Sequence, residues 1–555
     1  MKKIIIIKER KRVDNNMPKI VINEIDNTVN GLNDLTSNNI VYIPGNYSSG
    51  EFDKPYIFNS YKSFVETMGS RPTGDSPTLG STWDYAYNIL LLGFPVIAYR
   101  VTPRNENNEP VLPKTATAIM KADYSNSEST NNVATVSFKY EGTEGNRYSY
   151  SIYNSEAAVF FRVYREEKLI ESKKLIDIID GENPDTKRER SITAAQNLNS
   201  KYVNITISKE QKDYFTLTPI ERVKLSGGTD PAYEQVQSAI KNSYGYLEDK
   251  YLYDVKFLTS GGYYEESEDS PEVDLTKYDK NITSSMLKLA ETRTDCLAIL
   301  DIPYQLPEDS AQSYFGNVSS SYATAYLPWI NIKLPDKTTK WMPPGFVWLM
   351  KLAKSLGSGN KIWLPPAGIT RASVTEAVKA EYDIGQAQSE ALQTSNPNYI
   401  NPIIKLLKYG YVIWGQRTLL PAAEGDYYGT TTSSLQELSV RLITIEIKKT
   451  IWNACLELTF EQNHIRTWNE FNSKVQPLLI EMKADGALYD YEIKMDRTTM
   501  TDDDINNNKV RGTVRISPTR AAEDWEIDFV LEPSGVTFGN DDELSNGQNF
   551  YLTEV

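Results

Sequence analysis

Short apolar runs alternate with helical segments through the middle of the chain, and this alternation limits the possible folds more than any other feature. Apolar residues recur at helical spacing in 231–242 and 284–293, whereas strand-type runs occupy 254–258 and 296–302. Strands that alternate with amphipathic helices are typical of a largely parallel sheet covered by helices. We therefore expect a central α/β domain, placed at 228–421.

A similar pattern occurs near the start of the chain. A strand-type run at 38–45 precedes a segment at 60–69 that begins with Ser, has helical apolar spacing and ends in Gly. Ser and Gly are the usual residues at the two ends of a helix. A second helical pattern at 82–93 leads into an apolar run at 95–101, so 28–104 is predicted to form a small α/β unit that packs with the core.

The segment 105–227 has a different character. A polar linker bounded by prolines, 103–110, precedes four runs in which apolar and polar residues alternate: 132–140, 148–153, 159–164 and 202–207. Alternation with period two and short turns indicates half-buried strands. We expect a mostly β inserted domain, built as a sandwich.

The C-terminal part is predicted to be an α+β domain at 422–533. A link rich in Gly, Ser and Thr, 424–434, precedes two long helical stretches. These helices are expected at about 435–459 and 467–485, and strands at 489–495, 509–516 and 524–531. The chain of 555 residues is too long for one hydrophobic core, which agrees with several domains.

Both ends of the chain carry strand-type residues without a neighbouring strand to pair with. We interpret 1–27 and 534–555 as arms that add a strand to the sheet of an adjacent subunit, and disordered termini are the alternative. The arm residues expected to pair are Ile20, Val21, Ile22, Ile25, Phe550, Tyr551, Leu552 and Val555.

Composition argues against several classes of function. A net charge of −15 disfavours nucleic-acid binding, which needs a basic surface. Cys296 and Cys455 lie in apolar runs and are expected to be free, buried thiols. The apolar run at the N-terminus is too short for a signal peptide, and no stretch is long enough to cross a membrane. We expect a soluble protein made in a cytoplasm, without membrane insertion.

Catalytic residues are equally hard to place. The chain has one histidine, His464, between two predicted helices, and no Gly-x-Ser-x-Gly motif, so it is interpreted as a capping or packing residue. Gly357-Ser-Gly-Asn-Lys361 lacks the spacing of a phosphate loop and is interpreted as a turn. The acidic groups Asp502–Asp504 and Asp541–Asp542 lack the pattern of a calcium loop. We predict no catalytic, cofactor-binding or metal-binding residues, although carboxylate pairs for glycoside hydrolysis cannot be identified or dismissed by spacing.

Several motifs, in order along the chain, resemble those of the tail sheath family of contractile-tailed phages and related contractile injection particles. They include Gly93-Phe-Pro-Val-Ile-Ala-Tyr-Arg-Val101, Leu225-Ser-Gly-Gly-Thr-Asp230, Ala298-Ile-Leu-Asp-Ile-Pro303, Trp363-Leu-Pro-Pro-Ala-Gly368 and Gly410-Tyr-Val-Ile-Trp-Gly-Gln-Arg-Thr-Leu419. The turn at 140–146 is a weaker match, because Glu141 stands where the family has Pro. The inserted domain matches least.

The resemblance implies a structural protein, not an enzyme. Its central domain would have a subtilisin-like fold, the inserted domain would lie outside, and the C-terminal domain would face an inner tail tube. Copies would polymerise helically around that tube and contract to drive it through the host envelope for genome delivery. Implied partners are further copies, the tube protein, and baseplate and tail terminator proteins. The location implied is a virion tail assembled in the host bacterial cytoplasm.

Other interpretations remain at this stage. The chain could be the sheath of an injection system outside any phage, or of a bacteriocin. A hydrolase that uses the central α/β domain is the alternative from another class. Within the last motif, Trp414 and Arg417 place an aromatic ring beside a cation, but no base, metal ligand or nucleophile accompanies them. We interpret the signature residues Trp414, Gly415, Arg417 and Thr418 as structural, closing the central domain where the C-terminal domain begins.

Overall fold

The computed structural model describes residues 39–520 except 123–131, 211, 266–274, 277–280, 308–309, 394–397 and 422–432. The chain divides into two compact units, Met1–Thr519 and Arg520–Val555, and all described helices and strands belong to the first. The predicted arms, the strand expected at 524–531 and the pair Asp541–Asp542 lie outside the described residues.

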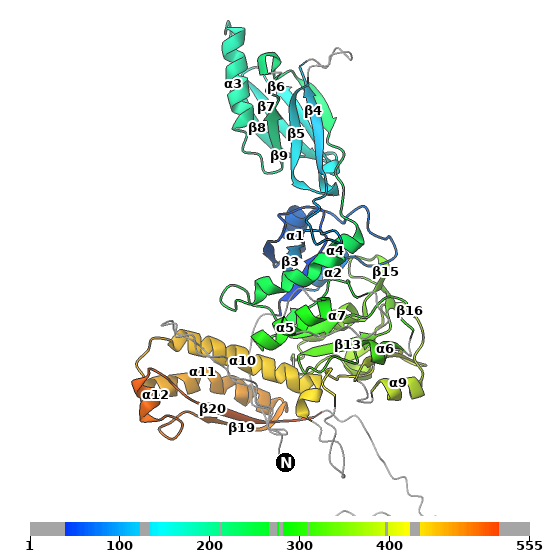
Figure 1. Cartoon of the computed structure of the whole chain (residues 1–555), viewed down its shortest axis with the longest axis vertical. Coiled ribbons are helices and arrows are strands. Elements are labelled where there is room, and N and C mark those ends of the chain that lie inside the picture. Colours follow the sequence, from blue (N-terminus) through cyan, green and yellow to red (C-terminus); the bar gives the residue numbers. More distant parts are fainter. Residues whose placement is uncertain are drawn as a thin grey trace, which may run out of the picture. The chain divides into compact units, whose positions relative to one another are not determined.

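An eight-stranded sheet forms the centre of the fold, with the order β18-β17-β13-β12-β11-β1-β3-β2. Figure 1 labels its strands β3 and β13. Every neighbouring pair from β3 to β17 is parallel, and only the outermost strands, β2 and β18, pair antiparallel. The largely parallel sheet predicted for the central domain is confirmed. Its strands are β1 (Val41–Gly45), β2 (Pro55–Phe58), β3 (Val96–Arg100), β11 (Phe257–Leu258), β12 (Leu297–Leu300), β13 (Ala323–Leu327), β17 (Asn401–Leu406) and β18 (Gly410–Ile413).

The first three strands belong to this same sheet. Val41 of β1 pairs with Val96 of β3 on one side and with Phe257 of β11 on the other. Residues 28–104 were expected to form a small unit beside the core, but their strands are instead part of the core sheet. Pairing between β1 and β11 spans a long stretch of sequence, and local patterns carry no information about such a partner.

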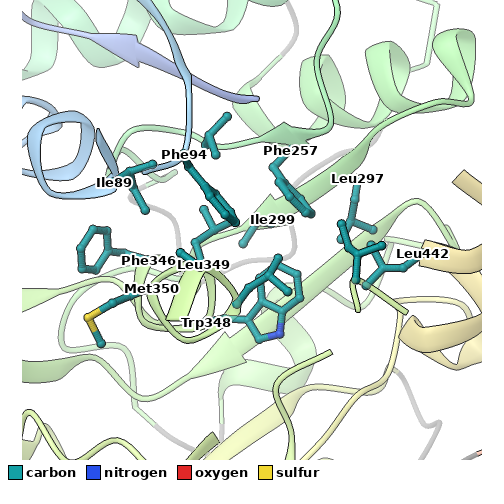
Figure 2. Packing of buried hydrophobic residues seen from close by; sticks show 14 of the residues in the cluster. Ile89, Phe94, Phe257, Leu297, Ile299, Phe346, Trp348, Leu349, Met350 and Leu442 are labelled. Carbon is teal, nitrogen blue, oxygen red and sulfur yellow. The ribbon is translucent and has the colours of Figure 1, made fainter. Parts of the chain in front are cut away.

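Helices cover both faces of the sheet. Val41 and Ile43 contribute to one buried cluster, and Tyr42, which points to the opposite face, contributes to the other. The first cluster packs against α7, whose Trp348 lies close to Phe257 (Figure 2). Residues buried on both faces explain why the strands are almost continuously apolar. The covering helices are α2 (Thr82–Leu91), α7 (Pro344–Gly357) and α10 (Leu438–Leu458) on the first side, and α4 (Tyr233–Ile240) and α5 (Ile282–Arg293) on the second.

The predicted end signals of the first helix are confirmed. In α1 (Tyr61–Met68), the Ser60 side chain accepts a hydrogen bond from the Lys62 backbone, and Gly69 follows with φ of 79°. A small sheet and three short helices complete this region. The sheet has the order β15-β14-β16, with β14 at Ile330–Lys333, β15 at Thr339–Met342 and β16 at Ala377–Ala380. The helices are α6 (Ala311–Tyr314), α8 (Gly368–Ala372) and α9 (Gln386–Leu392).

Residues 115–224 form two antiparallel sheets with a hydrophobic core of their own. The sheet β10-β6-β7-β8 and the sheet β4-β5-β9 both contribute to this core, as the sandwich prediction requires. Strand β8 and helix α3 were not predicted, because their sequences are rich in charged residues and lack clear periodicity. The elements are β4 (Thr115–Lys121), β5 (Asn132–Glu141), β6 (Tyr148–Asn154), β7 (Ala158–Arg165), β8 (Lys168–Asp177), α3 (Pro184–Gln196), β9 (Val203–Ile207) and β10 (Ile220–Lys224).

The C-terminal part pairs α10 with a second long helix, α11 (Ile465–Ala484), and both lie close to their predicted positions. Antiparallel strands β19 (Leu488–Lys494) and β20 (Thr513–Pro518) pack beside α11, and the short helix α12 (Asp502–Asn506) lies between them in sequence. Among the residues described, no helix has the length and apolar character needed to cross a membrane.

Candidate functional site

The signature segment leaves β18 and joins three parts of the fold through its backbone. The N–H of Trp414 donates to the Pro402 carbonyl of β17 at 2.8 Å, and that of Leu419 donates to the Ala323 carbonyl of β13 at 2.8 Å. The N–H of Thr418 donates to the carbonyl of Gln436 at 2.8 Å, just before α10. The segment therefore ties the end of the central sheet to the start of the C-terminal helices.

Asn401, the first residue of β17, fixes the path of this segment. Its Oδ1 accepts from the Arg417 N–H at 2.6 Å, and its Nδ2 donates to the Arg417 carbonyl at 2.9 Å and to the Ala325 carbonyl at 3.0 Å. The side chain is fully buried, so these bonds satisfy polar groups that water cannot reach. A Cβ at Gly415 would lie 2.7 Å from Asn401 Oδ1, which explains the glycine.

Thr418 and its neighbours lead directly into α10. The Thr418 hydroxyl donates to the Leu435 carbonyl at 2.8 Å, and the N–H of Leu438 donates back to the Gln416 carbonyl at 2.9 Å. These bonds satisfy backbone groups at the first turn of α10, where a helix has no partners of its own. The start of α10 is thus fixed by the signature segment.

The side chains of Trp414 and Arg417 contribute less than the backbone around them. The guanidinium of Arg417 lies over the ring of Tyr399, 5.5 Å from its centroid, and Trp414 is 39% exposed. The arrangement resembles packing and not a reaction centre.

The first half of α10 is buried along every face, although it carries four charged residues. Arg441, Glu446, Lys448 and Lys449 are all less than 5% exposed. Buried charges are tolerated only when other groups pair with them or accept their hydrogen bonds. Their partners lie on the segments that lead into β11 and β13.

Two of the pairs involve the residues just before β11. Glu446 forms an ion pair with Lys256, whose Nζ also donates to Asn39 Oδ1 at 2.8 Å. Burial lowers the pKa of Lys256 despite this pairing. Lys449 pairs with Asp254 and donates to the Val255 carbonyl at 2.8 Å.

The other two cations meet near the start of β13. Lys448 Nζ donates to the Tyr322 hydroxyl at 2.7 Å, and the guanidinium of Arg441 lies over the Tyr322 ring, 3.9 Å from its centroid. Arg441 also donates to the Ser321 hydroxyl. Together with the pairs at β11, these contacts fix α10 against the amino ends of the parallel strands.

The carboxyl ends of the strands are the usual place for a ligand in an open α/β sheet, and here protein groups fill that edge. Asp301, directly after β12, accepts from the Gly345 N–H at the start of α7 and from the Ser260 hydroxyl, both at 3.2 Å. A Cβ at Gly345 would lie 2.6 Å from Ile299 and 2.7 Å from Asp301. Burial raises the pKa of Asp301 to about 7.

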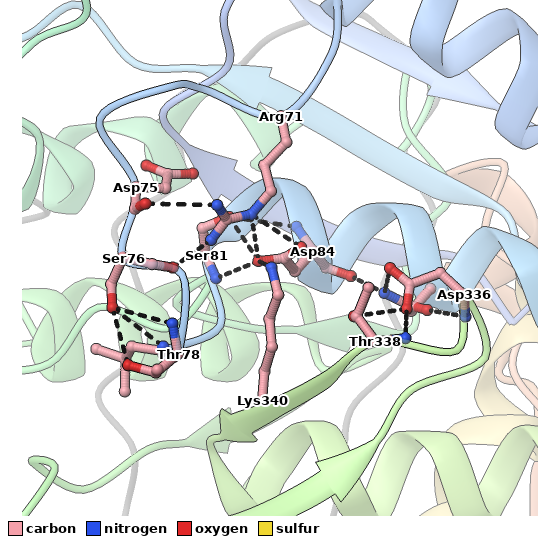
Figure 3. A network of polar contacts seen from close by, with 11 residues as sticks. Arg71, Asp75, Ser76, Thr78, Ser81, Asp84, Asp336, Thr338 and Lys340 are labelled. Atoms are coloured by element: carbon pink, nitrogen blue, oxygen red, sulfur yellow. Dashed lines mark hydrogen bonds and ion pairs between the residues drawn. The ribbon is translucent and has the colours of Figure 1, made fainter.

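A second buried carboxylate is fully engaged in pairing. Asp84 accepts from Lys340 Nζ at 2.6 Å and from Arg71 Nε at 2.9 Å, and it caps α2 through the Ser81 N–H at 3.0 Å (Figure 3). This network joins α2 to β15. All of these partners are protein groups, so this carboxylate stabilises the fold.

The remaining candidates for chemistry occupy structural positions. His464 is the N-cap of α11, where its Nδ1 accepts from the Arg466 N–H at 3.3 Å, so its predicted capping role is confirmed. Cys296 and Cys455 are free thiols, and burial raises their pKa values to about 12 and about 11. Asp504 caps α12. Within the described ranges, no group of three His, Cys, Asp or Glu residues could hold a metal ion.

The segment 357–361, which partly resembles a phosphate-binding loop in sequence, lies at the end of a helix. Gly357 is the last residue of α7, and Gly359 follows in a left-handed turn with φ of 89°. The interpretation of 357–361 as a turn is confirmed.

Comparison with known proteins connects this architecture to a family. The tail sheath protein of Enterobacteria phage T4 is 24% identical over 341 residues, which are 58% of this chain and 48% of that protein. A sheath tail protein from Listeria innocua superposes with a TM-score of 0.55 at 13% identity, covering 88% of this chain and 93% of that one. The chain is similar to tail sheath proteins.

A second solved structure supports the same relationship. The sheath tail protein from Desulfitobacterium hafniense has a TM-score of 0.50 at 13% identity and covers 83% of this chain and 91% of that one. No protein-family model matches the sequence. The chain spans about half the length of the phage T4 sheath protein. The family resemblance seen in the motifs is thus confirmed by sequence and by fold.

Proposed function

We propose that this chain is the structural subunit of a contractile tail sheath. Copies polymerise helically around an inner tail tube, and contraction drives the tube through the host envelope to deliver a genome. The observation that carries the proposal is the match to a phage tail sheath protein over more than half of the chain, together with a sheath fold. A virion tail, assembled in the host cytoplasm, is the proposed location.

The proposed role is not enzymatic. The hydrogen bonds from Ser260 and Gly345 to Asp301 support this, because they occupy the edge of the parallel sheet where ligands usually bind in such folds. The single histidine supports it too, since it caps a helix. A sheath of a non-phage injection system or a bacteriocin is the second candidate, and the phage relative favours the first.

We further propose roles for the parts of the chain. The central domain has the subtilisin-like fold of the family, the inserted β domain lies outside, and the C-terminal domain faces the tube. The parallel sheet with helices on both faces supports the first assignment. Trp414, Gly415, Arg417 and Thr418 act structurally, and the hydrogen bonds of their backbone support that role.

The arms at 1–27 and 534–555 are proposed to link adjacent subunits. Strands added to a neighbour persist while globular domains rotate, so contraction can be a two-state repacking that needs no nucleotide. An interface that does not close on itself produces an open helix, as a sheath requires. The tube protein contacts the inside of that helix, and baseplate and terminator proteins contact its two ends.

Electron microscopy of the purified chain tests the proposal. We expect long hollow tubes in negative stain, alone or with the tube protein, and no hydrolysis of ester, peptide or glycoside substrates. Discrete small particles with catalytic turnover would identify a hydrolase instead. Chains lacking 1–27 or 534–555 are expected to stay folded but to form no tubes, and full-length sheaths from either deletion would exclude the arms as links.

A further inference from the structure

The loop between α10 and α11 presents an aromatic side chain to solvent. Phe460 is 88% exposed, and its backbone has φ of 77°, a left-handed conformation that bulky residues rarely adopt. Such strain costs on the order of 1–3 kcal/mol and is concentrated at functional positions. Leaving a phenyl ring exposed to water is also unfavourable in free energy. Neither feature helps this chain fold.

Hydrogen bonds hold the loop on both sides of Phe460. The Thr459 hydroxyl donates to the Cys455 carbonyl at 2.7 Å, and the Glu461 N–H donates to the Leu458 carbonyl at 3.1 Å. Beyond the ring, the Thr467 hydroxyl donates to the Gln462 carbonyl at 2.7 Å. Little conformational freedom is then left to lose on docking, which favours binding.

Helix α12 lies near the start of α11, at the same end of the helix pair as Phe460 (Figure 1). Residues of both helices line a hollow of about 400 Å³ there. Ile465, Trp468 and Ile505 supply apolar lining. His464, Arg497 and Asn506 supply polar lining. An apolar floor with a few polar groups is suited to an aromatic ring that has a charged neighbour.

The charges beside the ring and in the hollow are opposite. Glu461, directly after Phe460, is exposed, and Arg497 in the hollow is exposed as well. Within the part of the chain that the structure describes, neither side chain forms an ion pair with another. One chain therefore carries both an aromatic–acidic projection and an apolar–basic recess.

We propose that Phe460 of one copy docks in this hollow, beside Trp468, on a second copy, where Glu461 pairs with the partner subunit's Arg497. The proposal rests on the polymeric function and adds a specific contact to it. When the projection of each copy enters the recess of the next, the contact is heterologous, and heterologous contacts that do not close on themselves build open assemblies. The ring is the central anchor of this contact, and the ion pair fixes its orientation.

Polymerisation of the full-length chain, followed by sedimentation and negative stain, tests this contact. Phe460→Ser is expected to raise the critical concentration roughly tenfold or more, as loss of a central aromatic anchor does. Tyr214→Ser removes an aromatic that is 57% exposed on the inserted domain and is the matched control, with no expected effect. Thermal midpoints of both variants should equal that of the parent chain or exceed it.

A charge swap gives a second test, in which misfolding of a single variant cannot be mistaken for loss of the contact. Glu461→Arg and Arg497→Glu should each weaken polymerisation several-fold, and the chain with both changes should recover it. Glu156→Arg, an exposed position on the inserted domain, is the control. A double variant no better than the single ones, or Phe460→Ser that polymerises like the parent, overturns the contact. If Phe460→Ser forms normal sheaths that fail to hold the tube protein, the tube is the partner, and the proposal is also overturned.

Failure of the contact and failure of the proposed function look different. A parent chain that forms no polymer under any condition contradicts the sheath function itself. A parent chain that polymerises, with variants indifferent to Phe460, Glu461 and Arg497, contradicts the contact alone.

Discussion

Asn401 and Arg417 form a reciprocal pair of hydrogen bonds between a buried amide side chain and a backbone segment. The Arg417 N–H donates to Asn401 Oδ1 at 2.6 Å, and Asn401 Nδ2 donates to the Arg417 carbonyl at 2.9 Å. One side chain thereby holds the segment that connects the central sheet to α10. The stability of the whole joint should depend on it.

Asn401→Ala should destabilise the chain by about 2–4 kcal/mol, because the buried N–H of Arg417 loses its acceptor and a small cavity is left. Urea unfolding measured by tryptophan fluorescence checks this. Asn204→Ala, at an exposed position of β9, is the control and should change little. Equal midpoints for the two variants would show that Asn401 does not hold the joint.

Gly415→Ala should also be destabilising, since the added methyl group would lie 2.7 Å from Asn401 Oδ1 and 3.2 Å from the Asn401 backbone. We expect a loss of about 1–3 kcal/mol, typical of overpacking in a well-packed interior. Gly357→Ala is the matched control, because nothing lies within 4 Å of its added Cβ. A Gly415→Ala chain with an unchanged thermal midpoint would contradict the close approach.

Glu446→Gln should leave Lys256 as a buried charge without its carboxylate, and loss of one partner of a buried pair costs about 3–5 kcal/mol. Adding Lys256→Met to Glu446→Gln should recover much of that loss, which a double-mutant cycle measures. The control is Glu457→Gln, which breaks an exposed pair with Lys474 and should have no measurable effect. Strictly additive losses from Glu446 and Lys256 would show that the two do not interact.

Asp301 makes stability depend on pH. Its folded pKa is about 7 and its ordinary value is 3.8, so the folded chain keeps a proton that the unfolded chain has released. Its contribution is fully present below pH 3.8 and is lost as pH rises through about 7. Asp301→Asn stays neutral, and its thermal midpoint relative to the parent should therefore rise between pH 5 and pH 8.

The size of this effect follows from the pKa difference. Each pKa unit corresponds to about 1.4 kcal/mol, so the variant should gain on the order of 2–3 kcal/mol relative to the parent over that interval. Asp213→Asn, at an exposed position, should show no such trend. A parallel pH profile for Asp301→Asn and the parent would mean that Asp301 is ionised in the folded chain throughout.

Much of the local structure could be predicted from the sequence because its signals are local. Ser60 and Gly69 mark the ends of α1, and apolar spacing locates α10 and α11 to within a few residues. The pairing of β1 with β11 could not be predicted, since strands that meet across an inserted domain share no local signal. Strand β8 was missed because its exposed, charged residues hide the alternation.

The candidate site was only partly visible in the sequence. The motif at 410–419 drew attention to Trp414 and Arg417, whereas the structure gives the larger role to the backbone there and to Asn401. The sequence gives no sign of this role for Asn401. Asn before Pro is common in turns and does not by itself indicate a buried, hydrogen-bonded side chain. The four charged residues of α10 were equally hard to interpret, since a charged residue within an apolar helix usually faces water and here does not.

The position of β1 between β3 and β11 sets the order in which the chain can fold during synthesis. Strand β1 leaves the ribosome early, but its partner β11 emerges only after the whole inserted domain has been made. The inserted domain has its own core and contiguous sequence, so it can fold first, whereas the parallel sheet must wait for distant strands. Until then β1 and β3 expose apolar faces that are prone to aggregate. We expect a nascent chain to depend most on chaperones before β11 has been made.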